Sequence, residues 1–449
     1  MSFTTDKQTL DDLNLNGRYD PHSIYNLFNK VQTAGGEKLL EALFRQPLAD
    51  PREINRRSRV FEYFEQTDLT FPFTRQQLVV MEDYLAGNSG HWLPAAVAAA
   101  RKRLAAAFVR DEAWGVLQHG VTTVIDVLHG LADLLHRLAD MGPDGPYQDQ
   151  LARLQDILKD QRLRLPSPEI LPSPERLPAD SMRLTLSGVI RYDHLFRHVL
   201  RERLLQVTEG IYQLDVNIAV GKVARSKGFS YAQALPKERA VLGVVDLRHP
   251  GIPKAVANSL TLHRESNMLF LTGANMAGKS TFMKALGIAV YLAHMGFPVA
   301  TTEMTFSVLD GLYTSINVPD NLSLGYSHFY AEVLRVKKVA EAVASGKDLL
   351  VIFDELFKGT NVKDAYDATL AVTEAFSRYR NCYFIISTHI IEAGEALREK
   401  CGNLLFAYLP TIMEGMTARY TYRLETGITS DRHGMLIIEN ERILDIIQA

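Results

Sequence analysis

The sequence predicts two regions of different fold class, an all-α region followed by an α/β region with a largely parallel sheet. Apolar residues recur at three- and four-residue steps through the first half of the chain, which is the period of an amphipathic helix. From Ala240 onward, short apolar runs alternate with such helical patterns, and this alternation is typical of parallel sheets. We therefore expect a helical domain over residues 1–235 and an α/β domain over residues 236–449.

Length and composition indicate a globular protein that does not enter a membrane. The 449 residues exceed what one hydrophobic core usually serves, and 47% of them are hydrophobic and 22% charged. No segment approaches the roughly 18 uninterrupted apolar residues of a membrane span, and the polar start is unlike a signal peptide. The two cysteines, Cys382 and Cys401, support neither a disulfide framework nor a four-ligand metal site. We expect a cytoplasmic protein.

Three stretches make up the predicted helical domain. Helical patterns cover residues 21–141 and include the Ala-rich stretch 93–109. Residues 142–178 contain seven prolines around one short helical stretch, 148–163, and we expect a connector there. Residues 192–225 carry apolar side chains at helical spacing without a proline, so we expect one long helix of about 45 to 50 Å.

Seven apolar runs predict the strands of the α/β domain. We expect those separated by helical patterns to pair in parallel, and those near the end of the chain to form an antiparallel tail. The predicted strands are residues 241–245, 268–271, 349–353, 383–386, 404–408, 420–424 and 435–438.

The run Gly-Ala-Asn-Met-Ala-Gly-Lys-Ser-Thr, residues 273–281, fills every fixed position of the phosphate-cradling loop G-x-x-x-x-G-K-[ST]. A predicted buried strand precedes it, and a helical pattern over 280–294 follows, which is the order that this loop requires. Glycines let the backbone N–H groups turn inward, and the helix N-terminus adds positive potential for phosphates. We expect ATP or GTP to be bound by Gly273, Asn275, Met276, Ala277, Gly278, Lys279, Ser280 and Thr281.

Chemical roles are expected for five residues at this site. Lys279 would reach the β- and γ-phosphates, and Ser280 would be a ligand of Mg²⁺. Asp354 ends a predicted strand and would hold the Mg²⁺ shell, while the adjacent Glu355 would orient or deprotonate the attacking water. His389 follows the next strand and would sense the γ-phosphate. Alone, an Asp-Glu pair is more often a strand cap, and a single His is more often a core or surface group. Their spacing after a complete phosphate loop favours a hydrolytic site. Its catalytic candidates are Lys279, Glu355 and His389.

These motifs resemble those of the MutS family of DNA mismatch-repair ATPases, and the resemblance extends over most of the chain. Residues 247–250 and 256–258 resemble the segment that leads into the MutS nucleotide pocket, and residues 33–57 resemble the start of the MutS core helical domain. The motifs that carry the resemblance are the phosphate loop with its Asn-Met-Ala-Gly-Lys-Ser, the signature segment Leu324–Glu332, the run Asp354–Thr360 and the triplet Ser387–His389.

The resemblance implies an α/β P-loop NTPase domain of the ABC/MutS type, preceded by an all-α core and lever domain. It also implies that the nucleotide is ATP and that two identical chains dimerise through their ATPase domains. Ser327 of the signature segment would then point across the dimer toward the γ-phosphate bound by the partner. Asn275 would bind phosphate or position water within the loop, and Glu332 belongs to the same signature.

Departures from the family pattern qualify the expected function. The chain begins at the core helical region, so we expect the mismatch-reading and connector domains, with their Phe-x-Glu wedge, to be absent. We expect the DNA-contacting clamp insertion to be missing or vestigial, and we expect little of the C-terminal dimerisation extension. Ala255 stands where the family commonly carries an aromatic that packs on adenine. We therefore expect no recognition of single mismatches by this protein alone.

Two functional classes fit these observations. The first is a dimeric, ATP-gated DNA clamp acting in mismatch repair or related repair and recombination, with a branched or distorted duplex as its ligand. The second is a nucleotide-switched interaction protein that acts on a ribonucleoprotein or protein partner. A net charge of −3 gives no support to nucleic-acid binding, so any DNA contact must come from a local patch. Candidate patches, which solvated helix faces also explain, are Arg52, Arg56, Arg57 and Arg59, residues 101–103, and residues 197–203.

Overall fold

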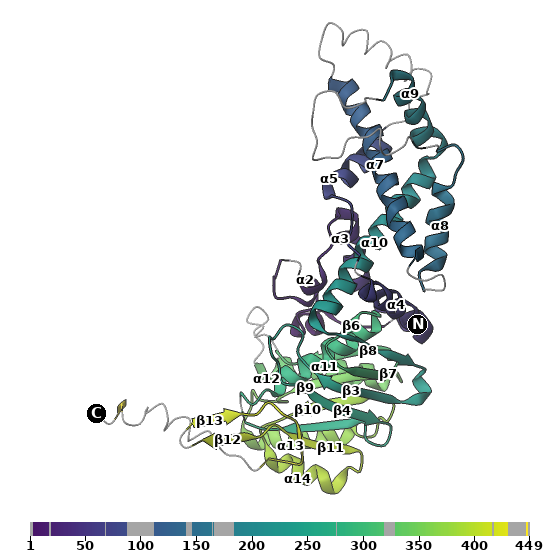
Figure 1. The fold of residues 1–449 in the computed structure, drawn as a ribbon. Coiled ribbons are helices and arrows are strands. Elements are labelled where there is room, and N and C mark those ends of the chain that lie inside the picture. The colour runs from purple at the N-terminus through teal and green to yellow at the C-terminus, as the bar shows by residue number, and fades with distance from the viewer. Residues whose placement is uncertain are drawn as a thin grey trace. The chain divides into compact units, whose positions relative to one another are not determined.

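A computed structural model of the chain shows its fold (Figure 1). The structure describes residues 3–17, 19–67, 69–87, 112–140, 146–163, 165, 184–274, 276–317, 328–414, 417–429 and 446–447. Four of the sequence predictions lie outside these residues. They are the Ala-rich stretch 93–109, the second half of the connector, the strand 435–438 and the placement of Asn275 and Ser327. None of the described helices has both the length and the apolar character that a bilayer span requires.

The chain divides into two compact units. The helical unit comprises residues 29–42 and 60–222, and the α/β unit comprises residues 1–28, 43–59 and 223–449. These units differ from the division expected at residue 235 because two early segments are built into the α/β unit. Thr4 forms a parallel bridge with Gly311, and the Tyr291 hydroxyl donates a 2.5 Å hydrogen bond to the Phe44 carbonyl.

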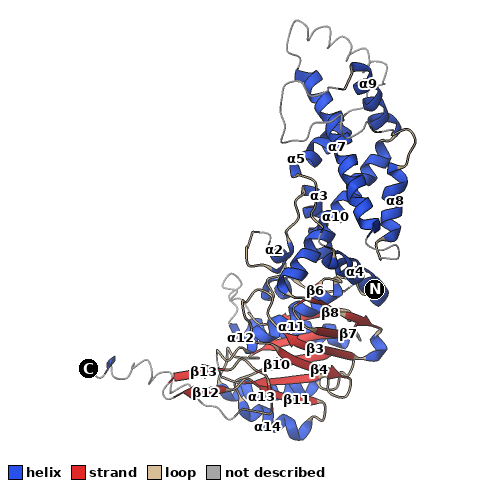
Figure 2. Cartoon of the chain, viewed as in Figure 1, coloured by secondary structure: helices blue, strands red, loops and turns tan. Residues whose placement is uncertain are grey.

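Helices alone form the secondary structure of the described part of the helical unit, as predicted (Figure 2). Its core is aliphatic and aromatic and includes Leu128 and Leu131 from one helix and Leu204 and Ile211 from another. At the start of α5, Thr74 and Gln77 bond each other's backbone N–H groups, a capping box that fixes where the helix begins. The helices that contribute to this unit are α3 (Ala34–Arg45), α4 (Pro51–Gln66), α5 (Arg75–Ala86), α7 (Glu112–Asp140), α8 (Gln148–Leu158), α9 (Leu186–His194) and α10 (Arg201–Lys227).

The prediction of one uninterrupted helix over residues 192–225 is wrong. A π-helical turn, η2 (Leu195–Val199), separates α9 from α10, and the Leu200 N–H donates to the Leu195 carbonyl five residues back at 2.8 Å. Buried Phe196, Leu200 and Leu204 recur at four-residue steps across this turn, so the spacing of the apolar side chains does not reveal it. The remaining continuous helix, α10, spans about 40 Å at 1.5 Å per residue.

A six-stranded sheet is the core of the α/β unit. Its order is β14-β11-β5-β10-β9-β8, and every neighbouring pair is parallel except β11 with β14 at the edge. This arrangement confirms the predicted parallel sheet, whereas the antiparallel edge strand, residues 425–426, is not one of the predicted runs. The strands are β5 (Met268–Thr272), β8 (Gly311–Ser315), β9 (Leu349–Asp354), β10 (Tyr383–Ser387), β11 (Leu404–Tyr408) and β14 (Glu425–Thr426).

Helices cover both faces of this sheet (Figures 1 and 2). One face packs through Val351 and Phe353 against α12 (His328–Ala344), α13 (Val362–Phe376) and α14 (Ile391–Lys400). The other face carries Ile352, which lies against α11 (Lys279–His294) at Gly287. Successive strand residues point to opposite faces, and helices cover both of them, so every residue of β9 up to Phe353 is buried. This burial explains why the strand is a continuous run of apolar residues.

A second, four-stranded sheet was not predicted. Its order is β2-β7-β3-β4, with β3 antiparallel to both neighbours. Of these strands only β3 was predicted. Strand β4 alternates exposed and buried residues and so lacks the continuous apolar run that would have indicated it. The elements not yet named are α1 (Lys7–Asp12), α2 (Ile24–Phe28), η3 (Lys237–Arg239), β1 (Ser230–Tyr231), β2 (Gln233–Leu235), β3 (Val241–Leu247), β4 (Asn258–His263), β6 (Pro298–Val299), β7 (Glu303–Ser307), β12 (Thr411–Glu414) and β13 (Thr417–Tyr420).

His294, at the end of α11, is fully buried in the α/β unit. Its Nδ1 donates to the Leu48 carbonyl at 2.8 Å, since a carbonyl can only accept, and its Nε2 accepts from the Leu309 N–H at 3.3 Å. The ring packs between Phe3 and Phe306. Burial lowers the pKa of His294 to about 4, although the bond to Leu48 opposes the shift. The folded protein therefore holds this imidazole neutral.

We predict that His294 makes the α/β unit less stable in acid. The unfolded chain takes up a proton below pH 6.5, whereas the folded chain does so only near pH 4, so the stabilisation is complete above pH 6.5 and declines as pH falls toward 4. Between pH 7 and pH 5 the free energy of unfolding should drop by about 2 kcal/mol from this group alone. Urea unfolding of the parent and of His294→Gln at both pH values measures the difference, and equal pH dependence in the two proteins would contradict it.

Candidate nucleotide site

The phosphate loop connects β5 to α11, as the motif requires. Gly273 and Gly278 have φ values of 143° and 103°, a region that favours glycine because other residues would strain there. Met276 also has a positive φ of 71°, and its side chain is 78% exposed at the loop tip. Ala277 is buried and donates its N–H to the Ala274 carbonyl. The two glycines thus serve the backbone turn that was inferred from the sequence.

Lys279 is enclosed by this loop and is only 5% exposed. Its Nζ donates to the Gly273 carbonyl at 2.8 Å and to the Ala274 carbonyl at 3.2 Å, and lies 3.9 Å from a Glu355 carboxylate oxygen. Burial lowers the pKa of Lys279, while the charges of Glu355 and Asp354 oppose that shift. The ammonium group is therefore held by weak neutral acceptors, which an anion can replace.

Asp354, the last residue of β9, lies at the centre of the polar contacts. Its Oδ2 accepts a 2.5 Å hydrogen bond from the Ser280 hydroxyl, and its Oδ1 accepts a short hydrogen bond from the Ser387 hydroxyl. The parallel register of β9 and β10 places Ser387 directly opposite Asp354. The two residues expected to hold Mg²⁺ are thus in contact, and their hydroxyl and carboxylate oxygens are donors that a hard cation prefers.

Glu355 lies between Lys279 and His389. Its Oε1 is 3.9 Å from the Lys279 Nζ and 3.9 Å from the His389 Nδ1. Its backbone has a φ of 53°, an uncommon conformation for a residue with a side chain, and its N–H donates to the Ser387 carbonyl at 3.1 Å. The strand end therefore turns sharply at Glu355. The three residues predicted to be catalytic are brought together in this way.

A cavity of about 770 Å³ is lined by Lys279, Ser280, Asp354 and Glu355, whereas His389 is not part of its wall. Ligand sites of roughly 300 to 1,000 Å³ take small molecules, so the volume suits a nucleotide. Thr281, Asp354 and Glu355 belong to its wall, as do Ala255 and Asn317 from other segments. Of the remaining predicted site residues, Asn275 and Ser327 lie outside the described residues, and Glu332 on α12 is buried.

Tyr422 also lines this cavity, although no motif in the sequence predicts it there. Its ring lies against the phosphate loop, with Cδ1 3.0 Å from the position that a Cβ on Gly278 would occupy. The strand expected over residues 420–424 is wrong, because β13 ends at Tyr420 and Tyr422 has a φ of 56°, which no strand residue adopts. Asn258 holds this turn by bonding the Tyr422 carbonyl and the Leu424 N–H. Nothing local in the sequence joins Tyr422 to a loop so distant along the chain.

Comparison with known proteins supports a relationship to MutS. Residues 269–447 match the model of the family described as MutS domain V. The chain is 24% identical, over 297 residues, to the DNA mismatch repair protein MutS of Petrotoga mobilis (strain DSM 10674 / SJ95). That alignment covers 64% of this chain and 35% of the relative, so the chain matches about a third of the length of that protein. MutS domain V is an ABC-type ATPase domain, and this assignment implies ATP binding.

We predict that Tyr422 contributes to ATP affinity through its ring. Stacking of a base on an aromatic side chain contributes roughly 1 to 3 kcal/mol, so Tyr422→Ala should weaken binding of a non-hydrolysable ATP analogue about tenfold. Tyr422→Phe keeps the ring and should bind within about twofold of the parent. Titration calorimetry on the three proteins compares them. A loss in Tyr422→Phe as large as in Tyr422→Ala would mean that the hydroxyl, and not the ring, is the binding group.

Proposed function

The C-terminal half of this chain is a MutS family ATPase domain, and from this premise we propose that the protein hydrolyses ATP with Mg²⁺ in the cavity beside the phosphate loop. The observation that carries the proposal is the convergence of Lys279, Asp354 and Glu355 on that cavity. They come from a helix start and a strand end that are far apart in the sequence. Their charges match those required to bind phosphate, a divalent cation and water.

Each side chain has a role that its contacts support. Lys279 exchanges the carbonyls of Gly273 and Ala274 for the β- and γ-phosphates, which are stronger acceptors. Ser280 and Asp354 hold Mg²⁺, which when bound neutralises charge on the phosphates. No group of three or more acidic, His or Cys side chains with metal-binding geometry occurs among the described residues, so nucleotide and water would complete the shell.

Glu355 is the proposed base that orients or deprotonates the attacking water. Its carboxylate is partly exposed to the cavity, and Lys279 and His389 lie on either side at 3.9 Å. The ammonium group keeps the carboxylate close to the phosphate end of the loop. His389 is half-exposed beside Glu355, and this position supports its proposed role as a sensor of the γ-phosphate. We further propose that Ser327 from a second, identical chain completes the site.

The structure separates the basic clusters that were candidates for DNA contact. Arg197 pairs with Asp193 and lies over the Tyr84 ring, Arg201 donates to the Leu85 carbonyl, and Arg203 pairs with Asp160. These arginines have intramolecular partners, which agrees with a structural role. Residues 101–103 lie outside the described part of the chain.

Arg52, Arg56 and Arg59 are the arginines that we propose as DNA contacts. All three are exposed on α4, and their spacing of four and three residues places them on one face of the helix. Arg57, in contrast, points inward and donates to the Met295 carbonyl at 3.0 Å. A row of exposed guanidinium groups suits the phosphates of a duplex. Contacts with phosphates do not distinguish one base sequence from another, so the ligand would be recognised by its shape. We propose a branched or distorted duplex as this ligand, in mismatch repair or a related repair or recombination process.

We predict that Glu355→Gln abolishes ATP turnover while ATP binding stays within about threefold of the parent. The amide cannot take a proton from water, whereas Lys279 and the loop backbone that bind the phosphates are unchanged. Steady-state phosphate release and calorimetry measure the two properties, with Lys279→Ala as a variant that should lose binding itself. Turnover in Glu355→Gln at the parent rate would show that Glu355 is not the base.

Turnover per chain should also rise with protein concentration through the dimerisation range, and a constant value would argue against a composite site.

We predict that replacing Arg52, Arg56 and Arg59 together with Gln weakens DNA binding at low salt and makes it less dependent on salt. Each lost phosphate contact should reduce the slope of log K against log salt by about 0.9. The matched control is the triple replacement of the exposed Arg264, Lys347 and Arg378, which should leave the slope unchanged.

The ligands for this measurement are a perfect duplex, a one-base mismatch and a four-way junction, each with and without a non-hydrolysable ATP analogue. The junction should bind most tightly, with the difference enhanced by nucleotide. Selectivity for the mismatch over the junction would refute the proposed ligand. If the parent binds no nucleic acid, the alternative of a nucleotide-switched interaction protein with a protein or ribonucleoprotein partner gains support.

A further inference from the structure

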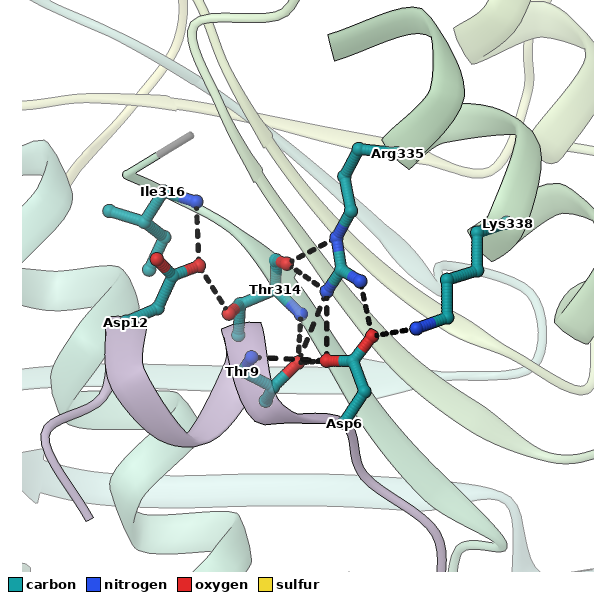
Figure 3. A network of polar contacts seen from close by, with 7 residues as sticks. All are labelled: Asp6, Thr9, Asp12, Thr314, Ile316, Arg335 and Lys338. Carbon is teal, nitrogen blue, oxygen red and sulfur yellow. Dashed lines mark hydrogen bonds and ion pairs between the residues drawn. The ribbon is translucent and has the colours of Figure 1, made fainter. Parts of the chain in front are cut away.

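The N-terminal helix α1 is bonded to the end of β8 by a buried carboxylate (Figure 3). Asp12, the last residue of α1, is 4% exposed and accepts three hydrogen bonds. The donors are the Thr314 hydroxyl at 2.6 Å, the Ile316 N–H at 2.9 Å and the Asn317 N–H at 3.1 Å. All three donors come from four consecutive residues, so this carboxylate grips the point at which β8 ends.

At the start of α1, Asp6 forms a second tie (Figure 3). Its carboxylate pairs with Arg335 and Lys338, both on α12, and Arg335 in turn donates from Nε to the Thr314 carbonyl at 3.0 Å. Burial opposes ionisation of Asp6, but the hydrogen bonds from Arg335 and Lys338 hold the pKa of its carboxyl well below the usual range. Thr9 adds a further bond, since its hydroxyl accepts the Thr314 N–H at 3.0 Å. Helix α1 is thus bonded to both β8 and α12.

The bonded end of β8 forms part of the nucleotide cavity. Ile316 and Asn317, whose N–H groups are held by Asp12, belong to the cavity wall with Lys279 and Ser280. Strand β8 pairs in parallel with β9, and Ser315 lies opposite Phe353. Ile316, the residue that follows β8, is therefore level with Asp354, the residue that contacts Ser280.

Ladder pairing cannot by itself hold this wall, because Ile316 and Asn317 follow the last residue of β8. Backbone N–H groups beyond a strand end need another acceptor, and a buried carboxylate needs donors in place of water. Asp12 meets both needs at once. Hydrogen bonds to a charged group are stronger than those between neutral groups, so the direction of the chain at Asn317 is fixed by Asp12.

We infer that Asp12 is a positioning residue of the nucleotide site, which holds Ile316 and Asn317 in place at the cavity wall while the Asp6–Arg335 pair holds α1 against β8 and α12. This inference rests on the proposed ATP site. Asp12 does not touch the cavity, so it acts through Ile316 and Asn317. A segment more than 300 residues from these positions in the sequence thereby becomes part of the machinery that binds nucleotide.

The test is Asp12→Asn, measured against Asp11→Asn. The amide loses the charge and directs an NH₂ group at one or more of the three donors. The KM for ATP and the dissociation constant of a non-hydrolysable ATP analogue should therefore each rise about five- to tenfold. The kcat should change by less than about threefold. Asp11 is the exposed neighbour on the same helix, and its replacement makes the same charge change without touching β8. Asp11→Asn should match the parent in all of these values.

Amide hydrogen exchange provides a readout that a general loss of stability would not reproduce. In Asp12→Asn the Ile316 and Asn317 amides should exchange at least about tenfold faster, while the amides of β10 exchange as in the parent. Thr314→Val removes one of the three hydrogen bonds and should move affinity and exchange in the same direction by a smaller amount. It also serves as the test variant if Asp12→Asn does not fold.

The outcomes separate this inference from the proposed function. If the parent binds no ATP analogue, the proposed function fails and the inference fails with it. If the parent binds and Asp12→Asn (or Thr314→Val in its place) binds equally well, only the positioning role is refuted. A loss of affinity accompanied by faster exchange throughout the sheet would also refute it, because Asp12 would then stabilise the whole fold.

Discussion

The pairing of β9 with β10, which sets Asp354 opposite Ser387, is the constraint on which the site depends. Parallel strands end at the same edge of a sheet, and here β5 ends at that edge as well, where it continues into the phosphate loop. The Ser387 hydroxyl orients Asp354, and Asp354 holds Ser280 at the start of α11. One register therefore fixes a loop, a helix and two carboxylates relative to one another.

A buried positive charge complements this edge of the sheet. Removing an ammonium group from water is costly. Lys279 recovers only part of that cost from two backbone carbonyls and from the Glu355 carboxylate, which at 3.9 Å is too distant to accept a hydrogen bond. A phosphate would satisfy the group far better. The arrangement is thus prepared for an anion. Of the two carboxylates that oppose the lowering of the Lys279 pKa, Glu355 and Asp354, Asp354 would accept a divalent cation brought with it.

Strained backbone conformations also occur around the same cavity. Met276, Glu355 and Tyr422 all have positive φ values, and all three line the cavity wall. Such conformations persist only where the surroundings fix them. The bonds from Glu355 to Ser387 and from Asn258 to the Tyr422 turn are the surroundings that do so here. Rigid neighbours of this kind keep side chains in place without help from a ligand, which favours binding because less order has to be imposed.

The sequence by itself determined the phosphate loop, the strand before it, the helix after it and the pairing of fold classes, because each depends on residues close together in the chain. A loop motif with its flanking periodicity is local, and so is an acidic pair at a strand end. Tertiary structure decided what no local pattern encodes. It brought Tyr422 to Gly278, bonded Asp12 to Asn317, turned Arg57 inward while Arg56 stayed exposed, and interrupted the helix at Leu195. The first two join residues more than a hundred positions apart, and Arg57 points inward because it donates to the Met295 carbonyl, so tertiary contacts and not periodicity selected these features.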